Sequence, residues 1–409
     1  MLVTEDLLHR AVEDVFAVRD RRVFGGLIAY RGRLLVAPAD AVDRLVARFR
    51  PFGFTPFLRA EGGEMILQAL PLAEPVMRPR IGLNIVLFVL TCFTTLVSGA
   101  FLFASPTFTP LGNSGVVAAL LTGAPFAFTL LSILGVHEFG HYFTARYYKA
   151  AVSLPYFIPA PPIVLFGTLG AIIRLRSPAR DRNSLFDIAA AGPLAGLVVA
   201  IPALYIVLFG TLGAIIRLRS PARDRNSLFD IAAAGPLAGL VVAIPALYMG
   251  LQWSVLAKIP SGDVMQFGDP LLLKLLVHLK FGAIPAGMDV FLHPVAVAGW
   301  AGFFVTALNL FPLGQLDGGR IAYALFGRHH RMVGFVTFGG LILLGIVTQS
   351  LNWFVWAALL FFLVGFHHTP PLDDVTPLTT GRRVLGWACL ILLVLLIPPV
   401  PIAFSSSVR

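Results

Sequence analysis

The chain has 409 residues, of which 57% are hydrophobic and 13% are charged, and its mean hydropathy is +0.84. Apolar runs of about 20 residues recur along it, which is typical of a protein that crosses a membrane several times. The net charge of +10 does not indicate nucleic-acid binding, because most of the arginines flank apolar segments, as the positive-inside rule predicts. Both cysteines, Cys92 and Cys389, fall inside apolar spans, so we expect neither a disulfide nor a thiolate metal site.

Residues 1–77 differ in composition from the rest of the chain and contain every glutamate except Glu138. Their pattern predicts the following elements: helices at 7–16 and 38–50, strand at 25–37, and a hairpin over 54–70. We therefore expect a small cytoplasmic α+β domain, of roughly the minimum size for an independent core. A plain structural module is the expected role, and a regulatory or substrate-presenting module is the alternative.

Residues 78–409 are predicted to form a transmembrane domain with about seven main helical spans. The expected spans are 81–104, 124–148, 185–208 or its copy 228–251, 294–312, 332–348, 351–366 and 384–403. The apolar run 271–279 is too short to span and suits a helix at the membrane interface. The basic loops at 146–182, 320–331 and 382–383 all fall on one side, counting one copy only, and the positive-inside rule makes that side cytoplasmic.

The second expected span contains the string His137-Glu138-Phe139-Gly140-His141. Residues four apart share a helix face, so His137 and His141 can hold one zinc ion, and Glu138 is placed to take a proton from water on that ion. In a soluble chain, an accidental match on an ordinary helix would be a serious alternative. In a membrane span a charged group costs about 2.5–3.5 kcal/mol, so its presence indicates a function.

The short stretch 167–176 is prone to form strand and follows four prolines that exclude a regular helix. Non-helical backbone at membrane depth is tolerated only where protein covers it or where it lines a cavity. Two interpretations are open. One is a short β-type re-entrant segment near the active site, whose edge could pair with an extended peptide, and the other is a plain cytoplasmic hairpin.

The chain also contains a perfect tandem duplication, because residues 163–205 and 206–248 are the same 43-residue string. Solenoid repeats diverge and need several units, so two identical copies indicate a recent duplication or an assembly error. If both copies crossed the membrane, everything downstream would invert. We therefore expect one copy to be surplus to the working fold, although identical sequences do not reveal which one.

A catalytic zinc ion usually takes three protein ligands plus water, and the histidines supply two. Glu138 is the last glutamate, so the third ligand must be an aspartate, histidine or cysteine. Asp317 is the best candidate, because it lies in the string NLFPLGQLDGGR directly after an apolar span. A turn aspartate in an Asp-Gly bend is the alternative. Asp187 and Asp230 are weaker candidates, since each lies just before its span, where an N-terminal cap is the simpler account.

Taken together, HEFGH and NLFPLGQLDGG resemble the paired motifs of the site-2 protease family of intramembrane zinc metalloproteases, in particular its EGY-like branch. The resemblance covers roughly residues 81–331. It implies three zinc ligands: His137, His141 and Asp317. It also implies that Glu138 is the catalytic carboxylate and that Asn309 steadies the substrate or the oxyanion. The string AAAGPLAG, which contains Gly192 in one copy and Gly235 in the other, is similar to the family's third-span motif.

The expected reaction is hydrolysis of peptide bonds in transmembrane protein substrates, by zinc-activated water with Glu138 as general base. We expect an integral protein of a prokaryotic cytoplasmic membrane, in contact with lipid, with its active site near the cytoplasmic face. No nucleic-acid partner is expected, and the sequence does not predict an oligomeric state.

Two other functions are possible. A transporter of zinc or another divalent cation would need histidines and carboxylates on several spans, whereas here they gather at one depth. A catalytically inactive membrane scaffold would be expected to have lost Glu138 or a ligand, and this chain keeps them.

Overall fold

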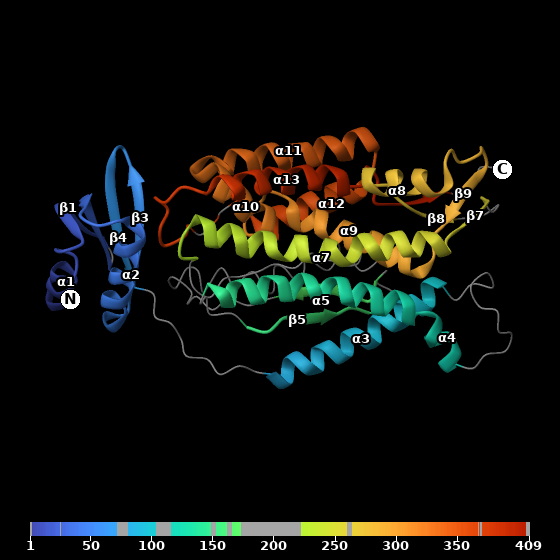
Figure 1. Ribbon diagram of the computed structural model, residues 1–409, viewed down its shortest axis with the longest axis horizontal. Coiled ribbons are helices and arrows are strands. Elements are labelled where there is room, and N and C mark those ends of the chain that lie inside the picture. The colour runs from blue at the N-terminus through green and yellow to red at the C-terminus, as the bar shows by residue number, and fades with distance from the viewer. Residues whose placement is uncertain are drawn as a thin grey trace.

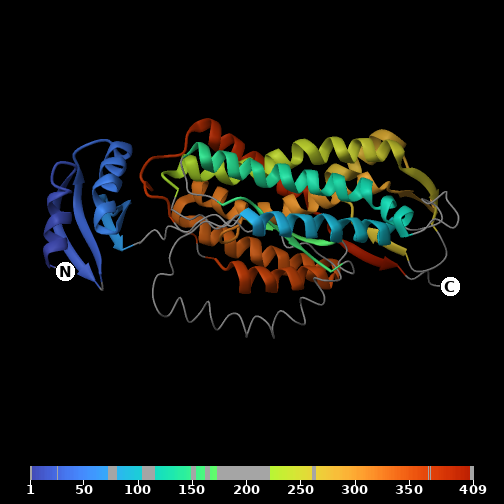
Figure 2. The same cartoon turned by 90° about the horizontal axis from the view of Figure 1, so that it is seen from below.

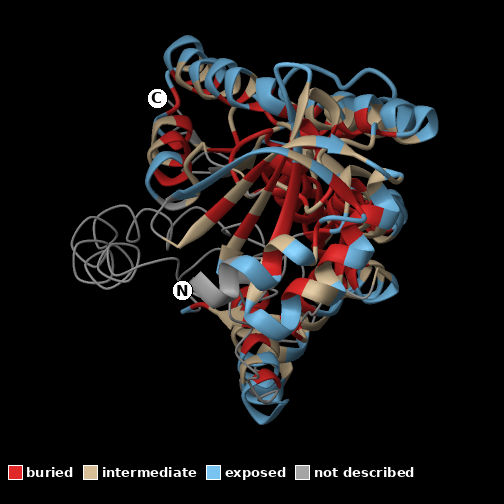
Figure 3. Ribbon diagram, turned by 90° about the vertical axis from the view of Figure 1, so that its left-hand side faces the viewer, coloured by how far each residue is buried: buried red, intermediate tan, exposed pale blue. Residues whose placement is uncertain are grey.

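The structure, a computed structural model, describes residues 2–24, 26–71, 81–103, 116–148, 153–161, 166–172, 222–259, 264–366, 368 and 370–405. Within these residues a small sheet domain lies at one end of an elongated bundle of helices (Figure 1). The bundle and the sheet domain agree with the expected fold class. Seen from the end that carries the sheet domain, buried residues gather in the middle of the molecule and exposed residues on the outer helices (Figure 3).

The N-terminal domain is a four-stranded antiparallel sheet, in the order β1-β2-β4-β3, with two helices. Its elements are α1 (Leu2–Arg10), β1 (Phe16–Phe24), β2 (Leu27–Leu34), α2 (Pro38–Phe49), η1 (Arg50–Phe52), β3 (Phe54–Glu61) and β4 (Glu64–Pro71). Helix α2 buries Ala41, Leu45 and Phe49, which are four residues apart and share one face, as in an amphipathic helix. The hairpin expected over 54–70 is confirmed. The helix expected at 7–16 ends earlier, and strand β1 begins where that helix was expected to end.

The bundle is built from ten α-helices among the described residues. They are α3 (Ile81–Phe103), α4 (Val116–Thr122), α5 (Ala124–Tyr147), α7 (Arg225–Trp253), α8 (Leu271–Phe281), α9 (Pro294–Leu310), α10 (Asp317–Phe326), α11 (His330–Thr348), α12 (Leu351–Leu359) and α13 (Thr380–Leu396). The short helix η2 (Gly327–His329) joins α10 to α11, and a π-helical segment, η3 (Leu360–Val364), follows α12. Helix α9 is buried along its whole length, and α7 packs against both α5 and α9. These three helices therefore form the centre of the molecule.

Helix α3 shows the reverse of the pattern found in soluble proteins. Thr91 and Thr95 are buried against the bundle, whereas Ile85, Val89 and Phe93 are each more than half exposed. Small and polar residues at helix contacts, with apolar residues facing outward, are typical of membrane helices. Among the described residues, three helices are long and apolar enough to cross a membrane: Ile81–Phe103, Arg225–Trp253 and Asp317–Thr348. The count of seven spans stays a prediction.

Strands β5 (Tyr156–Pro159) and β6 (Thr168–Ile172) form an antiparallel pair that lies beside α3 (Figure 2). The amide of Asn84 donates to the carbonyl of Pro155 at 2.8 Å, and the Thr94 hydroxyl donates to the carbonyl of Gly167 at 2.6 Å. Ten residues of helix separate these two anchors, so the hairpin follows α3 for about 15 Å. The expected strand is thus confirmed up to residue 172, and the remainder of the stretch 167–176 lies outside the described residues.

The two copies of the duplicated string contribute differently to the described fold. Strand β6 belongs to the first copy, and α7 comes from the second copy, 206–248, with five residues beyond it. Residues 173–221 lie outside the described residues, and with them the alternative third span, 185–208. The described fold therefore takes one strand of its hairpin from the first copy and its central helix from the second.

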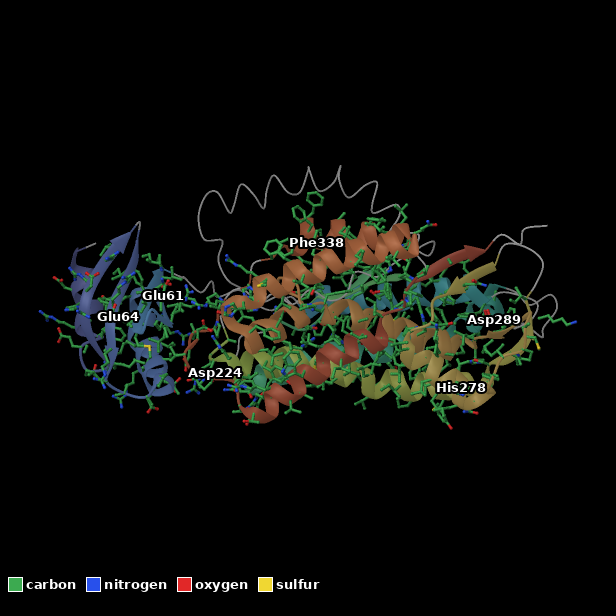
Figure 4. The ribbon with its side chains drawn as sticks, turned by 90° about the horizontal axis from the view of Figure 1, so that it is seen from above. Glu61, Glu64, Asp224, His278, Asp289 and Phe338 are labelled. Carbon is green, nitrogen blue, oxygen red and sulfur yellow. The ribbon has the colours of Figure 1, made fainter. Side chains whose placement is uncertain are left out.

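Short strands close the far end of the bundle, where β7 (Val255–Lys258) pairs with β9 and β8 (Val264–Phe267) pairs with β10. Strand β9 spans Met288–Phe291, and β10 spans Ile402–Ser405. Helix α8 confirms the expected helix at 271–279. Figure 4 shows Asp224 at the end of the bundle beside the N-terminal domain, and His278 and Asp289 at the opposite end.

A loop of the bundle around Asp373 contacts the N-terminal domain. Leu58, on the edge strand β3, donates its N–H to the carbonyl of Leu372 at 2.8 Å and accepts from the N–H of Asp374 at 3.1 Å. The N–H of Asp373 in turn donates to the carbonyl of Arg223 at 2.8 Å, just before α7. The loop therefore forms isolated β-bridges with the sheet edge and with Asp224, and it ties the domain to the start of α7.

Candidate metal centre

Helix α5 carries HEFGH into the middle of the bundle. The helix runs for 24 residues without an internal proline beyond its first turn, so the spacing of four places His137 and His141 on one face. Both imidazoles and the Glu138 carboxyl group are buried, with exposed fractions of 2%, 1% and 0%. The structure therefore places three costly polar groups where only mutual contacts or a ligand can compensate their desolvation.

Asp317 reaches the same point from a distant part of the chain. Helix α9 ends at Leu310, and Asp317 is the first residue of α10, fully buried. A Cβ on the next residue, Gly318, would overlap the carbonyl of Leu310. Glycine is therefore needed here for close approach, since it allows α10 to start directly against the end of α9 and brings the carboxylate to the histidines.

Three potential ligand atoms converge. Nε2 of His137 lies 3.2 Å from Nε2 of His141, and Oδ2 of Asp317 lies 3.1 Å from His141 Nε2 and 3.7 Å from His137 Nε2. Ligands at 2.0–2.1 Å from a tetrahedral zinc ion are about 3.3 Å apart, so the three separations suit such a site. Within the described residues, these three side chains form the one group that could hold a metal ion.

The hydrogen bonds of His141 support the same interpretation. Its Nδ1 lies 2.6 Å from the carbonyl of Ile231 on α7. Because a carbonyl oxygen can only accept, Nδ1 carries a proton, and in the neutral imidazole Nε2 then keeps its lone pair. Nε2 faces a carboxylate oxygen of Asp317 at 3.1 Å, an approach that needs either a shared proton or a metal ion between the two atoms. The donor set thus fits a bound divalent cation.

No hydrogen bond among the described residues accounts for the burial of the Glu138 carboxyl group. Both carboxyl oxygens are buried, and neither has a hydrogen-bond partner among the described residues. Buried polar atoms almost always have partners, and exceptions are typical of catalytic groups. Glu138 is thus the side chain at this site that is free to act on a water molecule or a substrate.

Asn309, on α9, also belongs to this cluster. Its side chain is fully buried, and its Nδ2 lies 3.0 Å from Nε2 of His137. The amide oxygen has no hydrogen-bond partner among the described residues. The structure therefore brings all five residues that the sequence singled out to one place, although their chemical roles remain proposals.

The weaker ligand candidate Asp230 is not at this site. Asp230 accepts two hydrogen bonds from Arg382, both at 2.6 Å, and a third from Tyr148. The expectation that it caps its helix was wrong, because the N-cap of α7 is Asp224, whose side chain accepts from the N–H of Ser227. The equivalent aspartate of the first copy, at position 187, lies outside the described residues.

Sequence reasoning missed the residues of α7 that pack against the histidines. Gly235 and Gly239 lie directly against the two imidazoles, and Ile231 supplies the carbonyl that contacts His141. The signal was present as the four-residue spacing of the glycines in AAAGPLAG, which favours close helix packing in membranes.

Comparisons with known proteins agree with this geometry. Probable zinc metalloprotease EGY1, chloroplastic, from Arabidopsis thaliana is 31% identical over 280 residues, which are 68% of this chain and 43% of that protein. Probable zinc metalloprotease EGY2, chloroplastic, from Oryza sativa subsp. indica is 28% identical over 410 residues, covering 96% of this chain and 65% of that protein. Probable zinc metallopeptidase EGY3, chloroplastic, from Arabidopsis thaliana is 38% identical over 111 residues, covering 26% and 19%. No solved structure matches the chain significantly.

These relatives confirm the resemblance to the EGY-like branch and identify zinc as the metal that the donor set suits. They are plant proteins named as chloroplastic, so they give no support to a prokaryotic cytoplasmic membrane. The chain spans 43% to 65% of the length of the first two. The sequence profile of Peptidase family M50 matches residues 125–211 and 205–347, and the two matches meet inside the duplicated string. Because these matches cover more than half of the chain and include HEFGH and Asp317, the chain belongs to peptidase family M50.

Proposed function

We propose that this chain is an intramembrane zinc metalloprotease that hydrolyses peptide bonds in transmembrane protein substrates. The observation that carries the proposal is the convergence of three buried ligand atoms beside a buried carboxyl group without a partner, in the centre of a bundle with an apolar exterior. A structural role would not require four ionisable groups at this depth.

His137, His141 and Asp317 are the proposed zinc ligands. When bound, zinc would lower the pKa of water towards about 7 and polarise a peptide carbonyl. Glu138 would accept the proton of the attacking water and deliver it to the leaving amine. Asn309 would donate its Nδ2 N–H to the substrate carbonyl, since Nδ2 already points into the site.

The hairpin of β5 and β6 is proposed to enter the membrane beside the site. Its contacts follow α3 for about 15 Å, which is half of a hydrocarbon core about 30 Å thick. A helical substrate must be extended before its peptide bonds can be reached, and an exposed strand edge can pair with such a segment. The active site is proposed to lie near the face with the basic loops, towards the N-terminal domain. The relatives do not support a prokaryotic membrane, and the proposal names no particular one.

The test is cleavage of a model single-span substrate by the purified full chain in liposomes, with zinc content measured on the same sample. We expect Glu138→Gln to keep its zinc and to lower the cleavage rate by about 10²–10⁴-fold, because only proton transfer is lost. A chelator should abolish cleavage in the unsubstituted chain. Wild-type activity in Glu138→Gln would remove this residue from the mechanism, and loss of zinc would make it structural.

A further inference from the structure

One wall of the metal centre is formed by α7, which supplies no ligand. Gly235 and Gly239 are four residues apart and share a helix face, and this face lies against the imidazoles of His141 and His137. A Cβ at 235 would overlap the His141 ring, and a Cβ at 239 would lie 3.1 Å from Nδ1 of His137. Any larger residue at 235 would therefore displace a ring that carries a ligand atom.

The same helix also orients the ring of His141. The Ile231 carbonyl lies one turn before Gly235 and 2.6 Å from Nδ1 of His141, which must donate to it. With the proton held on Nδ1, the lone pair of Nε2 points towards Asp317. Metal-ligating histidines usually donate their other N–H to a carbonyl or carboxylate in this way, which fixes both the tautomer and the ring orientation.

We propose that α7, built from the second copy of the duplicated string, positions the two histidines for metal binding. The carbonyl of Ile231 holds the proton and the angle of the His141 ring, and Gly235 and Gly239 leave the space that the two rings occupy. These are positioning residues, because they touch neither substrate nor metal, and the inference rests on the proposed metal site.

The duplication supplies an exact internal control. Gly192 and Gly196 of the first copy have the same neighbours in sequence as Gly235 and Gly239. Among the described residues, the second copy packs against the histidines. The same substitution should therefore weaken zinc binding in the second copy and have no effect in the first. Alanine favours helix more than glycine does, so a loss at 235 would not come from weakening α7 itself.

The experiment compares Gly235→Ala with Gly192→Ala in the purified full chain. Zinc affinity and the absorption spectrum of the cobalt(II)-substituted protein are measured, with size-exclusion elution and thermal unfolding as checks on folding. We expect Gly235→Ala to bind zinc about 10–100-fold more weakly and to change the cobalt spectrum. Gly192→Ala should match the unsubstituted chain. Unchanged affinity and spectrum in Gly235→Ala would overturn the proposal, as would an equal loss in Gly192→Ala.

If Gly235→Ala aggregates, Gly239→Ala and Gly196→Ala provide the same comparison with a milder overlap. A smaller loss of zinc affinity in the first, and none in the second, is expected, and no difference between them would contradict the proposal. Asp317→Ala separates this inference from the proposed function. Zinc retained in Asp317→Ala would refute the metal site itself. Zinc lost in Asp317→Ala but retained in the glycine variants would refute only the positioning role.

Discussion

Two of the proposed zinc-ligand atoms face each other in the metal centre. Nε2 of His141 and Oδ2 of Asp317 lie 3.1 Å apart, and neither is more than about 1% exposed. The Nδ1 proton of His141 is held on the other side of the imidazole by the Ile231 carbonyl. A bound cation would compensate the desolvation of both partners.

Asp317→Ala should therefore lower zinc affinity by more than the roughly 10–100-fold typical of losing an outer hydrogen-bond partner of a ligand. Two histidines would remain, and a two-ligand site is weaker than a three-ligand one. The measurement is zinc content after dialysis against a competing chelator. Asp289→Ala is the control, because this exposed carboxylate lies at the end of the bundle that is farthest from the N-terminal domain (Figure 4). Full zinc occupancy in Asp317→Ala would show that another group completes the site.

At the scale of elements, an ion pair links α7 to α13. Arg382 and Asp230 form a two-pronged contact that is only 32% and 23% exposed, and Tyr148 at the end of α5 donates to the same carboxylate. The pair ties three helices together at the end of the bundle nearest the N-terminal domain. Asp230 lies on α7 a little more than one turn before Gly235. The ion pair therefore also anchors the part of α7 that packs against the histidines.

Asp230→Asn should destabilise the protein by about 1–3 kcal/mol, because the Arg382 guanidinium then loses its charged partner while it remains partly buried. Thermal unfolding in detergent measures the change. Asp187→Asn alters the identical position of the first copy and should leave the unfolding temperature unchanged. Equal destabilisation by the two substitutions would mean that both copies make this contact.

Local patterns predicted some of these elements well and others poorly. Helical spacing was enough to join His137 to His141, and the lack of any glutamate after 138 directed attention to Asp317. Strand β1 was not recognised, because its four charged residues hide the alternation of a half-buried strand. The role of Asp230 was misjudged, because its partner Arg382 is 152 residues away. The wall formed by α7 is a tertiary contact, so its glycines had only a packing motif to indicate them.

At the scale of the whole molecule, residues outside the repeat explain why the second copy supplies α7. The repeat ends at Tyr248, and the helix continues to Gly250, where a Cβ would overlap the backbone of Ala296 at the start of α9. The position equivalent to Gly250 after the first copy is Val207. A helix from the first copy could repeat every contact up to Tyr205 but could not approach α9 in the same way. Identical strings are thus distinguished by the residues that follow them.

A crosslink reports directly which copy occupies this place. A Cβ at Gly302 would lie 3.1 Å from the Cβ of Ala243, so cysteines at 243 and 302 are close enough for a disulfide after slight relaxation. In a chain without Cys92 and Cys389, the pair at 243 and 302 should form a crosslink on oxidation. The pair at 200 and 302, which uses the same alanine of the first copy, should not. Crosslinking of both pairs would show that the copies exchange, and Gly250 would then not be selective.

Removing one copy tests whether the duplication matters for the enzyme. Deleting 163–205 or 206–248 leaves the same polypeptide. It retains one hairpin and one α7, including Gly250. Every described contact of the metal centre then comes from residues that remain, so this shorter chain should bind one zinc ion and cleave the model substrate at least as fast as the full chain. In this shorter chain 43 fewer residues separate β6 from α7, and the order of the described helices along the chain stays the same. A shorter chain that folds and binds zinc but does not cleave, beside an active full chain, would show that the extra copy contributes to catalysis.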